Sequence, residues 1–176
     1  MPCFEGFPSG KVKKTSCPIY IIDEQSGTDM ILDDSFKLKS QVCFPLYACA
    51  RRVANNYAPY LEPLGLTYTQ YITMLILWEE EEITIKDLCL KLYLDSGTIT
   101  PVIKKLINDG YIIKHRSVSD ERVVVVSLTD EGRKLYDKVK DVPKQVCGAL
   151  NEKGYEISDE KLSVLRDLLY EILKFC

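Results

Sequence analysis

The sequence predicts a mainly α-helical protein with a small β wing, in which a winged helix-turn-helix domain is flanked by N- and C-terminal dimerisation helices. Three observations carry this prediction: apolar residues at helical spacing before residue 60, a threonine-rich helix that starts near Asp95, and a charged β-hairpin directly after that helix. We assign residues 1–33 to an N-terminal extension and residues 34–176 to the winged-helix domain with its dimerisation helices. The winged helix itself covers about 67–128.

The spacing of apolar residues predicts the first helix. The residues at helical intervals are Phe36, Val42, Leu46 and Val53. The helix should run to the region of Tyr57 and end before Pro63. Pro45 either interrupts this helix or marks its true start, because a proline inside a helix removes a hydrogen bond and kinks the axis.

Capping residues set the starts of the next helices. Thr67 begins a capping box that closes on Gln70, and the acidic run Glu79–Glu82 ends this helix after Trp78. The later signals are Thr84 for a short helix to about Leu92, Asp95 or Ser96 for a longer helix through Asn108, Gly110 as its left-handed stop, and Thr129 for the helix after the hairpin. A final amphipathic helix should run from about Ser158 to Phe175.

The hydrophobic period changes after Gly110. Two apolar runs, Ile112–Ile113 and Val123–Leu128, flank a polar tip at Ser117–Glu121 and predict two antiparallel strands, the wing. The first helix and the helices after the wing have nothing else obvious to cover their apolar faces. We therefore expect them to pack against a second copy of the chain.

Composition limits the class of protein. No apolar run approaches the roughly 18 residues that cross a bilayer, and the N-terminal residues lack a secretory pattern, so we expect a cytoplasmic protein without membrane contact. The 7 cysteines include no Cys-x-x-Cys pair and are accompanied by 1 histidine, so we expect neither a structural metal nor a cofactor. Cys49, Cys89 and Cys176 have apolar neighbours and are interpreted as structural.

The distribution of charge favours DNA binding although the net charge is −3. Short side chains that can approach base edges open the threonine-rich helix: Ser96, Thr98 and Thr100. The basic residues that can reach phosphates or a narrow minor groove are Lys104, Lys105, Arg116 and Arg122, and Asp120 is expected to hold the Arg122 guanidinium. Alternatively, the threonines only cap and cover a surface, and the hairpin docks a protein partner.

The wing also carries a family signature. The string from Asp120 through Arg122 to Leu128-Thr129 resembles the D-x-R-x5-L-T wing pattern of the MarR family of bacterial transcription regulators. The strings Leu66–Tyr71, Leu77–Glu80 and Leu92–Pro101 are similar to the organic-hydroperoxide repressors of that family, over roughly residues 36 to 150. The resemblance implies a homodimer with interlocked terminal helices, in which each copy places its recognition helix in one half of a palindromic double-stranded operator.

Cys43 is the candidate redox-sensing residue. A thiol attacks a peroxide only as the thiolate and needs hydrogen-bond donors to favour that form; Tyr47 lies one turn on, whereas Tyr57 and Tyr68 are too distant along the chain to judge by spacing. In the family that the chain resembles, the reactive cysteine begins a Cys-Phe-x-Leu-Tyr string, here Cys43 to Tyr47. The resemblance further implies that tyrosines matching Tyr57 and Tyr68 reach the thiol across the dimer.

The same resemblance suggests how an oxidised thiol is resolved. Some members use a cysteine in the helix after the wing of the other subunit, which makes Cys147 the candidate, and others recruit a low-molecular-weight thiol. Pro45 departs from the small helix-forming residue that the family more often has, and a kink there would displace Cys43 from its tyrosines.

These observations predict a dimeric repressor that leaves its operator when an organic hydroperoxide or hypochlorite oxidises Cys43. One alternative is a repressor of the same family that responds to a noncovalent aromatic ligand. A thiol peroxidase is a further alternative, which we disfavour because no Cys-x-x-Cys or Thr-x-x-Cys motif near an arginine offers turnover. We therefore expect a regulator and not an enzyme.

Overall fold

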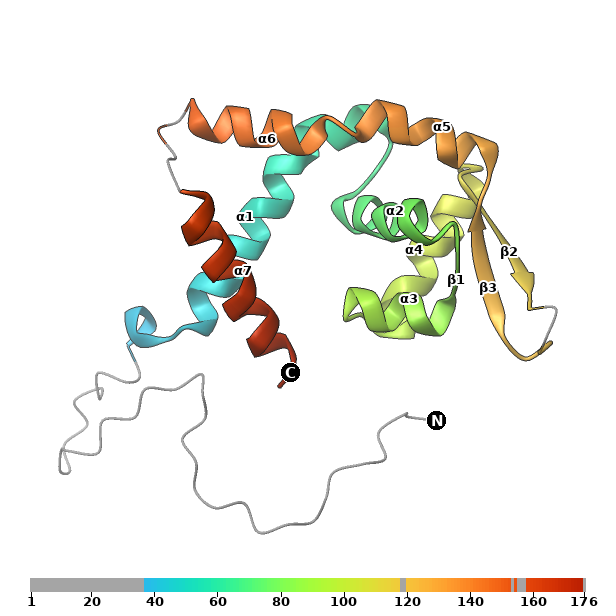
Figure 1. Ribbon diagram of the computed structural model, residues 1–176, viewed down its shortest axis with the longest axis horizontal. Coiled ribbons are helices and arrows are strands. Elements are labelled where there is room, and N and C mark those ends of the chain that lie inside the picture. Colours follow the sequence, from blue (N-terminus) through green and yellow to red (C-terminus); the bar gives the residue numbers. More distant parts are fainter. Residues whose placement is uncertain (1–36, 118–119, 153, 155–157, 176) are drawn as a thin grey trace, which may run out of the picture. The chain divides into compact units, whose positions relative to one another are not determined.

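The computed structural model describes residues 37–117, 120–152, 154 and 158–175 (Figure 1). They fall into two compact units, with the boundary after Val53, inside the first long helix. The elements in chain order are η2 (Leu38–Ser40), α1 (Cys43–Leu61), η3 (Glu62–Leu64), α2 (Tyr68–Glu80), β1 (Glu82–Thr84), α3 (Ile85–Leu92), α4 (Ser96–Asn108), β2 (Ile112–Arg116), β3 (Val124–Leu128), α5 (Asp130–Val139), α6 (Val142–Asn151) and α7 (Asp159–Leu173). The predicted fold class, mainly helical with a small wing, is confirmed. The extension expected at residues 1–33 lies outside the described residues.

Pro45 marks the start of α1 and does not interrupt it. The helix begins at Cys43, and its first backbone hydrogen bond runs from the Leu46 N–H to the Val42 carbonyl, at 3.3 Å. Pro45 therefore sits in the first turn, where a backbone N–H has no partner inside the helix and its loss removes no bond. The expectation that Val42 belongs to the helix is wrong, and Phe36 lies outside the described residues.

The predicted caps are confirmed. Thr67 forms both halves of a capping box, with the Gln70 side chain accepting from the Thr67 N–H at 2.7 Å and the Thr67 hydroxyl accepting from the Gln70 N–H at 3.3 Å. The side chains at the N-caps of α3, α4, α5 and α7 likewise accept from backbone amides, and these caps are Thr84, Asp95, Thr129 and Ser158. Gly110 ends the α4 region with a φ of 79°, as expected of a left-handed stop.

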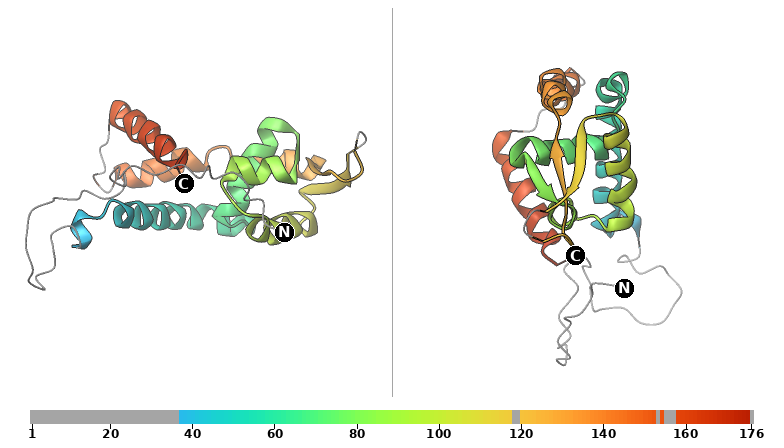
Figure 2. Two further views of the ribbon diagram at one scale, coloured as in Figure 1. Left: turned by 90° about the horizontal axis from the view of Figure 1, so that it is seen from below. Right: turned by 90° about the vertical axis from the view of Figure 1, so that its right-hand side faces the viewer.

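The sheet contains a strand that the sequence did not predict. Its order is β1-β3-β2, all antiparallel; the β2–β3 hairpin pairs Ile112 with Leu128, and β1 pairs Glu82 with Ser127. The acidic run that was expected only to end α2 instead turns at Glu81, with a φ of 62°, and continues as β1. The hairpin extends beyond the helices α2–α4 that it packs against (Figure 1 and Figure 2).

One buried core fixes the position of α4 and the wing. The core residues that are fully or almost fully shielded are Met74 and Leu77 of α2, Leu88 of α3, Ile99 and Leu106 of α4, Ile112 of β2 and Val126 of β3. Leu135 and Val139 join α5 to this core. Because α4 and both strands contribute to a single close-packed interior, the wing and α4 are held together as one body.

The apolar faces of α1 and α7 are left open in the single chain. In α7 no residue is buried, and Leu61 is the only buried residue of α1. The exposed apolar side chains of the two helices include Phe44, Tyr47, Val53, Leu162, Val164, Leu165, Leu168 and Tyr170. These are the faces for which the sequence predicted a second copy. Among the helices that the structure describes, none has the length and apolar character required to traverse a membrane.

Candidate DNA-binding surface and thiol site

The N-terminal turn of α4 is built around the Asp95 carboxylate. It accepts hydrogen bonds from the Thr98 N–H at 2.9 Å and the Thr98 hydroxyl at 2.8 Å, and the Thr98 hydroxyl is the main reason that the pKa of Asp95 is lowered. The Thr100 hydroxyl donates to the Ser96 carbonyl. The hydroxyl protons of Thr98 and Thr100 are thus already donated within the α4 N-terminal turn. The hydroxyl oxygens and methyl groups of these exposed side chains remain available for contacts with bases. An acceptor oxygen suits the amino groups of adenine or cytosine, and a methyl group suits that of thymine.

The structure distinguishes the two neighbouring lysines of α4. The Lys105 ammonium pairs with the Asp109 carboxylate of the same helix at 2.6 Å. For Lys104, no carboxylate of the described chain lies within ion-pair distance. Among the lysines and arginines of α4 and the wing, Lys105 is the one with a described carboxylate partner, while Lys114, Arg116 and Arg122 have no described acid at ion-pair distance. Of these, Lys104 and Lys114 line one hollow, so positive charge gathers there although the net charge of the chain is −3.

The base of the wing tip is braced by Arg116 and Asp120. The Arg116 guanidinium donates to the Glu121 carbonyl at 3.0 Å, and the Asp120 carboxylate accepts from the Arg122 backbone N–H at 2.9 Å. Asp120 was expected to hold the Arg122 guanidinium; instead it closes a local turn, as aspartate commonly does. Residues 118 and 119 of the tip lie outside the described part.

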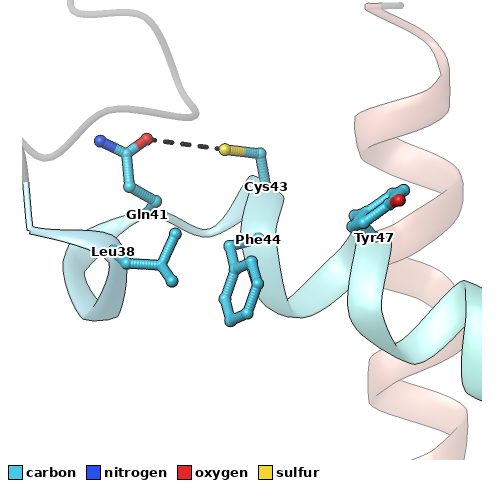
Figure 3. Close-up of a pocket in the computed structure, with 5 residues that line it drawn as sticks. All are labelled: Leu38, Gln41, Cys43, Phe44 and Tyr47. Carbon is cyan, nitrogen blue, oxygen red and sulfur yellow. Dashed lines mark hydrogen bonds between the residues drawn. The ribbon is translucent and has the colours of Figure 1, made fainter.

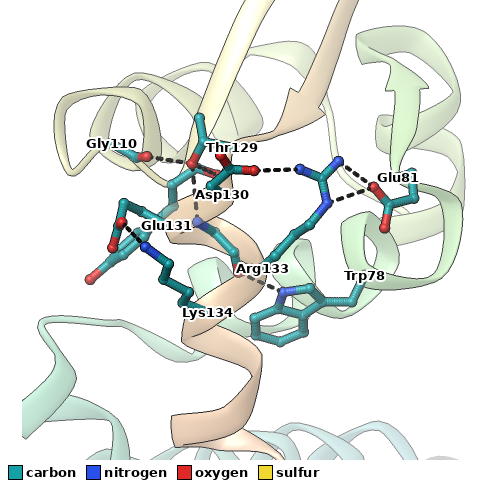
Figure 4. A network of polar contacts seen from close by, with 10 residues as sticks. Trp78, Glu81, Gly110, Thr129, Asp130, Glu131, Arg133 and Lys134 are labelled. Atoms are coloured by element: carbon teal, nitrogen blue, oxygen red, sulfur yellow. Dashed lines mark hydrogen bonds and ion pairs between the residues drawn. The ribbon is translucent and has the colours of Figure 1, made fainter.

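The wing is tied to α5 and α2 by a polar network (Figure 4). The Thr129 hydroxyl shares its one proton between the Gly110 and Tyr111 carbonyls, at 2.6 and 3.0 Å, and accepts from the Gly132 N–H at 3.0 Å. Arg133 donates twice to one Glu81 oxygen, at 3.0 and 2.6 Å, and the Trp78 indole donates to the Gly132 carbonyl at 2.9 Å. Only the Thr129 cap on the Gly132 N–H was predicted from the sequence, because hydrogen bonds and ion pairs between separate elements leave no local pattern.

Cys43 is exposed at the first position of α1, beside a shallow hollow of about 420 Å³ that Leu38, Gln41, Phe44 and Tyr47 also line (Figure 3). Its thiol donates to the Gln41 side-chain oxygen at 3.6 Å. Tyr47 was expected to hold this sulfur, but its hydroxyl accepts from the Arg51 guanidinium at 3.4 Å, and that guanidinium lies 5.5 Å from the centre of the Tyr47 ring. In the single chain, Tyr47 and Cys43 are not hydrogen-bonded to each other.

Tyr57 and Tyr68 are brought together with a third tyrosine. Tyr71 packs beside them, with ring centroids 5.1 Å apart for Tyr57 and Tyr68 and 5.6 Å apart for Tyr57 and Tyr71. Burial raises the pKa of all three phenols, to about 12 for Tyr71, so they stay protonated and can donate hydrogen bonds at neutral pH. Tyr71 was not among the predicted site residues, although its spacing from Tyr68 places both on one face of α2.

Cys147 lies close to this tyrosine cluster, which we define as Tyr57, Tyr68 and Tyr71. The Tyr60 hydroxyl donates to the Gln145 carbonyl at 3.4 Å, which holds α6 against the end of α1. After burial and the neighbouring Tyr68, the Cys147 sulfur is a further cause of the raised pKa of Tyr57. Cys147 is itself exposed. The structure thus gathers the two predicted tyrosines and the predicted resolving thiol in one place.

The remaining cysteines differ in part from expectation. Cys49 was interpreted as structural but is exposed, and Cys89 is half-buried with its pKa raised, first by burial and then by Asp95. Cys176 lies outside the described residues. Within the described ranges, no three metal-ligating side chains are grouped to hold an ion.

Comparison with known proteins identifies the family. Residues 56–139 match the family of transcriptional regulators SarA/Rot. The chain is 42% identical to the organic hydroperoxide resistance transcriptional regulator of Bacillus subtilis, over 80% of this chain and 92% of the relative. The chain belongs to the MarR family of transcriptional regulators, and is like the organic-hydroperoxide branch.

Other members of the family support this assignment. The regulator TtmR of Methylorubrum extorquens is 43% identical, over 93% of this chain and 84% of the relative. Reduced AbfR bound to DNA superimposes with a TM-score of 0.63 at 30% identity, covering 78% of this chain and 94% of AbfR, which comes from Staphylococcus epidermidis. A disulfide form of AbfR also matches, with a TM-score of 0.56. This MarR-family protein is therefore a DNA-binding transcriptional regulator and not an enzyme.

Proposed function

We propose that this MarR-family regulator is a cytoplasmic homodimeric repressor whose affinity for a palindromic operator depends on the oxidation state of Cys43. The tyrosine cluster is the observation that carries the proposal. Buried Tyr71 and half-buried Tyr57 and Tyr68, all with raised pKa values and close to Cys147, form a ready set of donors for a sulfur anion. We propose that this anion is the Cys43 thiolate of the second copy, since the exposed faces of α1 and α7 offer the contact surface.

The energies available suffice to favour a thiolate. A hydrogen bond to a charged acceptor contributes about 1.5–3 kcal/mol, and a helix N-terminus about 0.3–1 kcal/mol. Cys43 is the first residue of α1, so its sulfur lies at the positive end of that helix. Two phenols and the helix end together therefore supply about 3–7 kcal/mol toward the anion.

The chemical steps follow from thiolate reactivity. The Cys43 thiolate attacks one oxygen of an organic hydroperoxide, the O–O bond breaks, and the leaving alkoxide takes a proton to become an alcohol, so sulfur is oxidised to sulfenic acid. The Cys147 thiol of the second copy, or a low-molecular-weight thiol, then attacks that sulfur and releases water, which forms a disulfide. Hypochlorite serves as an alternative oxidant, with chloride as the leaving group.

Loss of the anion is the signal. A sulfenic acid or disulfide no longer accepts charge-assisted hydrogen bonds from the tyrosine cluster, so the contact between the two copies rearranges. Because α4 and the wing form one rigid body with the core, a shift of this body moves the recognition surface out of register with the half-site. The solved forms of the relative AbfR, reduced on DNA and with a disulfide formed, support such a cycle.

The proposed DNA surface is assembled from α4 and the wing. Ser96, Thr98 and Thr100 face the base edges in the major groove, and Lys104 contacts the backbone. Arg122 enters the adjacent minor groove, with Arg116 bracing the wing through the Glu121 carbonyl. We do not include Lys105 in this surface, because its ammonium pairs with Asp109 of the same helix.

A mobility-shift assay on the promoter region nearest the gene tests the proposed function. Reduced protein should bind, peroxide-treated protein should release the DNA, and re-reduced protein should bind again. Cys43→Ser should bind and stay bound under peroxide. If peroxide still releases the Cys43→Ser protein, the trigger lies elsewhere, and a MarR-type response to another signal replaces this proposal.

A further inference from the structure

A small hollow lies where the start of α3, one side of α4 and strand β2 meet. Its volume is about 230 Å³, and it is lined by Ile85, Thr100, Ile103, Lys104, Ile107 and Lys114. The three isoleucines make its floor apolar. Two lysines from different elements, Lys104 of α4 and Lys114 of β2, bring positive charge to its rim.

The two rim lysines differ from Lys105 in their surroundings. Within the described chain no carboxylate lies at ion-pair distance from Lys104 or Lys114, whereas Lys105, the next residue of α4, is held by Asp109 at 2.6 Å. Two unneutralised cations beside one small hollow repel each other, and an anion between them relieves that repulsion.

The geometry of the DNA duplex indicates which anion lies at the hollow. The major and minor grooves of a duplex are separated by one sugar-phosphate strand. If α4 occupies the major groove and Arg122 of the wing occupies the adjacent minor groove, the intervening strand must cross between α4 and the hairpin, where the hollow lies. This step rests on the proposed function.

We propose that the hollow seats a single backbone phosphate of the operator, held between the ammonium groups of Lys104 and Lys114. The apolar floor of Ile85, Ile103 and Ile107 faces the neighbouring deoxyribose. Thr100 does not donate to the phosphate, because its hydroxyl proton is already given to the Ser96 carbonyl. Lys114, which was not among the predicted DNA contacts, thereby becomes a positioning residue that holds the rigid body of α4 and the wing in register with the operator backbone.

The salt dependence of DNA binding tests the proposal directly. For wild type, Lys104→Gln, Lys114→Gln, the double variant and Lys105→Gln, the association constant is measured on operator and non-operator duplexes at several salt concentrations. Lys104→Gln and Lys114→Gln should each weaken binding to both duplexes about 10-fold. Each should also lower the slope of log K against log salt by about 1. Lys105→Gln makes the same charge change one residue away and should leave the slope near that of wild type.

Sharing of one phosphate predicts non-additive losses. The fold-reduction in the association constant of the double variant should be smaller than the product of the two single fold-reductions, because one lysine alone already holds the phosphate poorly. Lys114→Arg should keep the wild-type slope. The Lys104 and Lys114 variants should unfold at the wild-type temperature, since among the described residues neither lysine has an ion-pair partner to lose. An unchanged slope for Lys114→Gln, an equal effect of Lys105→Gln, or additive losses overturns the shared seat. Absence of salt-dependent binding by the wild type would instead overturn the proposed function itself.

Discussion

Gly132 is the position where one added methyl group most directly tests the packing of the wing against α5. A Cβ at this position would lie 2.1 Å from the Tyr111 carbonyl oxygen. That oxygen also accepts from the Thr129 N–H at 3.1 Å and hydroxyl at 3.0 Å, so it cannot move away without loosening the turn that joins wing and helix. Overpacking costs about 1–3 kcal/mol, and alanine returns at most about 1 kcal/mol of helix propensity. Because the clash is with backbone, we expect Gly132→Ala to lower the free energy of unfolding by about 2 kcal/mol.

Gly148→Ala is the matched control. Gly148 is also helical, but a Cβ there meets nothing within 4 Å, so alanine should raise the free energy of unfolding by about 0.5–1 kcal/mol. Urea unfolding followed by circular dichroism, at one protein concentration, measures both changes. The two variants should shift the midpoint in opposite directions. A Gly132→Ala midpoint at or above that of wild type would refute the packing argument.

Three further changes test local features. Thr67→Ala removes the acceptor for the Gln70 N–H and should cost about 1 kcal/mol in urea unfolding, with Thr67→Ser close to wild type. Tyr93 ends α3 with a φ of 53°, so Tyr93→Gly should stabilise the protein by about 1 kcal/mol; a loss would show that the exposed ring has a packing role. Hydrogen bonds from Thr98 hold the pKa of Asp95 below its ordinary value of 3.8, so the stability that this carboxylate contributes is complete above that value and lost as the pH falls through the lowered pKa. Below about pH 4, the free energy of unfolding of Asp95→Asn should therefore fall less steeply with decreasing pH than that of wild type. The same pH dependence for both proteins would contradict this.

Local signals explain how much of the fold could be predicted. The caps at Thr67, Thr84, Asp95 and Thr129 depend on one side chain and a backbone amide three residues on, so the sequence contains the whole interaction. The hairpin is similarly specified by its alternation and polar tip. Strand β1 was missed because its 3 residues are too few to show a period and its pairing partner, β3, lies some 40 residues on along the chain.

The candidate site was predictable to the extent that it depends on a family motif. Tyr57, Tyr68 and Cys147 were selected by resemblance, and the structure places them together because the end of α1 packs with α2 and α6. Spacing alone misjudged Asp120, whose carboxylate accepts from the Arg122 backbone N–H. A role of Tyr47 at the Cys43 sulfur stays a prediction, because in the single chain its hydroxyl accepts from Arg51. The difference between Lys104 and Lys105 likewise depends on which lysine reaches an acid, which composition does not reveal.

A mixed dimer tests most directly whether phenols of one copy activate the thiol of the other. Cys43→Ser subunits retain the tyrosines, and subunits with both Tyr57→Phe and Tyr68→Phe retain the thiol, so neither homodimer has a complete site. A dimer containing one of each rebuilds one complete site only if the tyrosines act across the interface. We predict that its single Cys43 is oxidised by an organic hydroperoxide at the wild-type rate and that oxidation releases operator DNA. Oxidation as slow as in the tyrosine-variant homodimer would contradict the account.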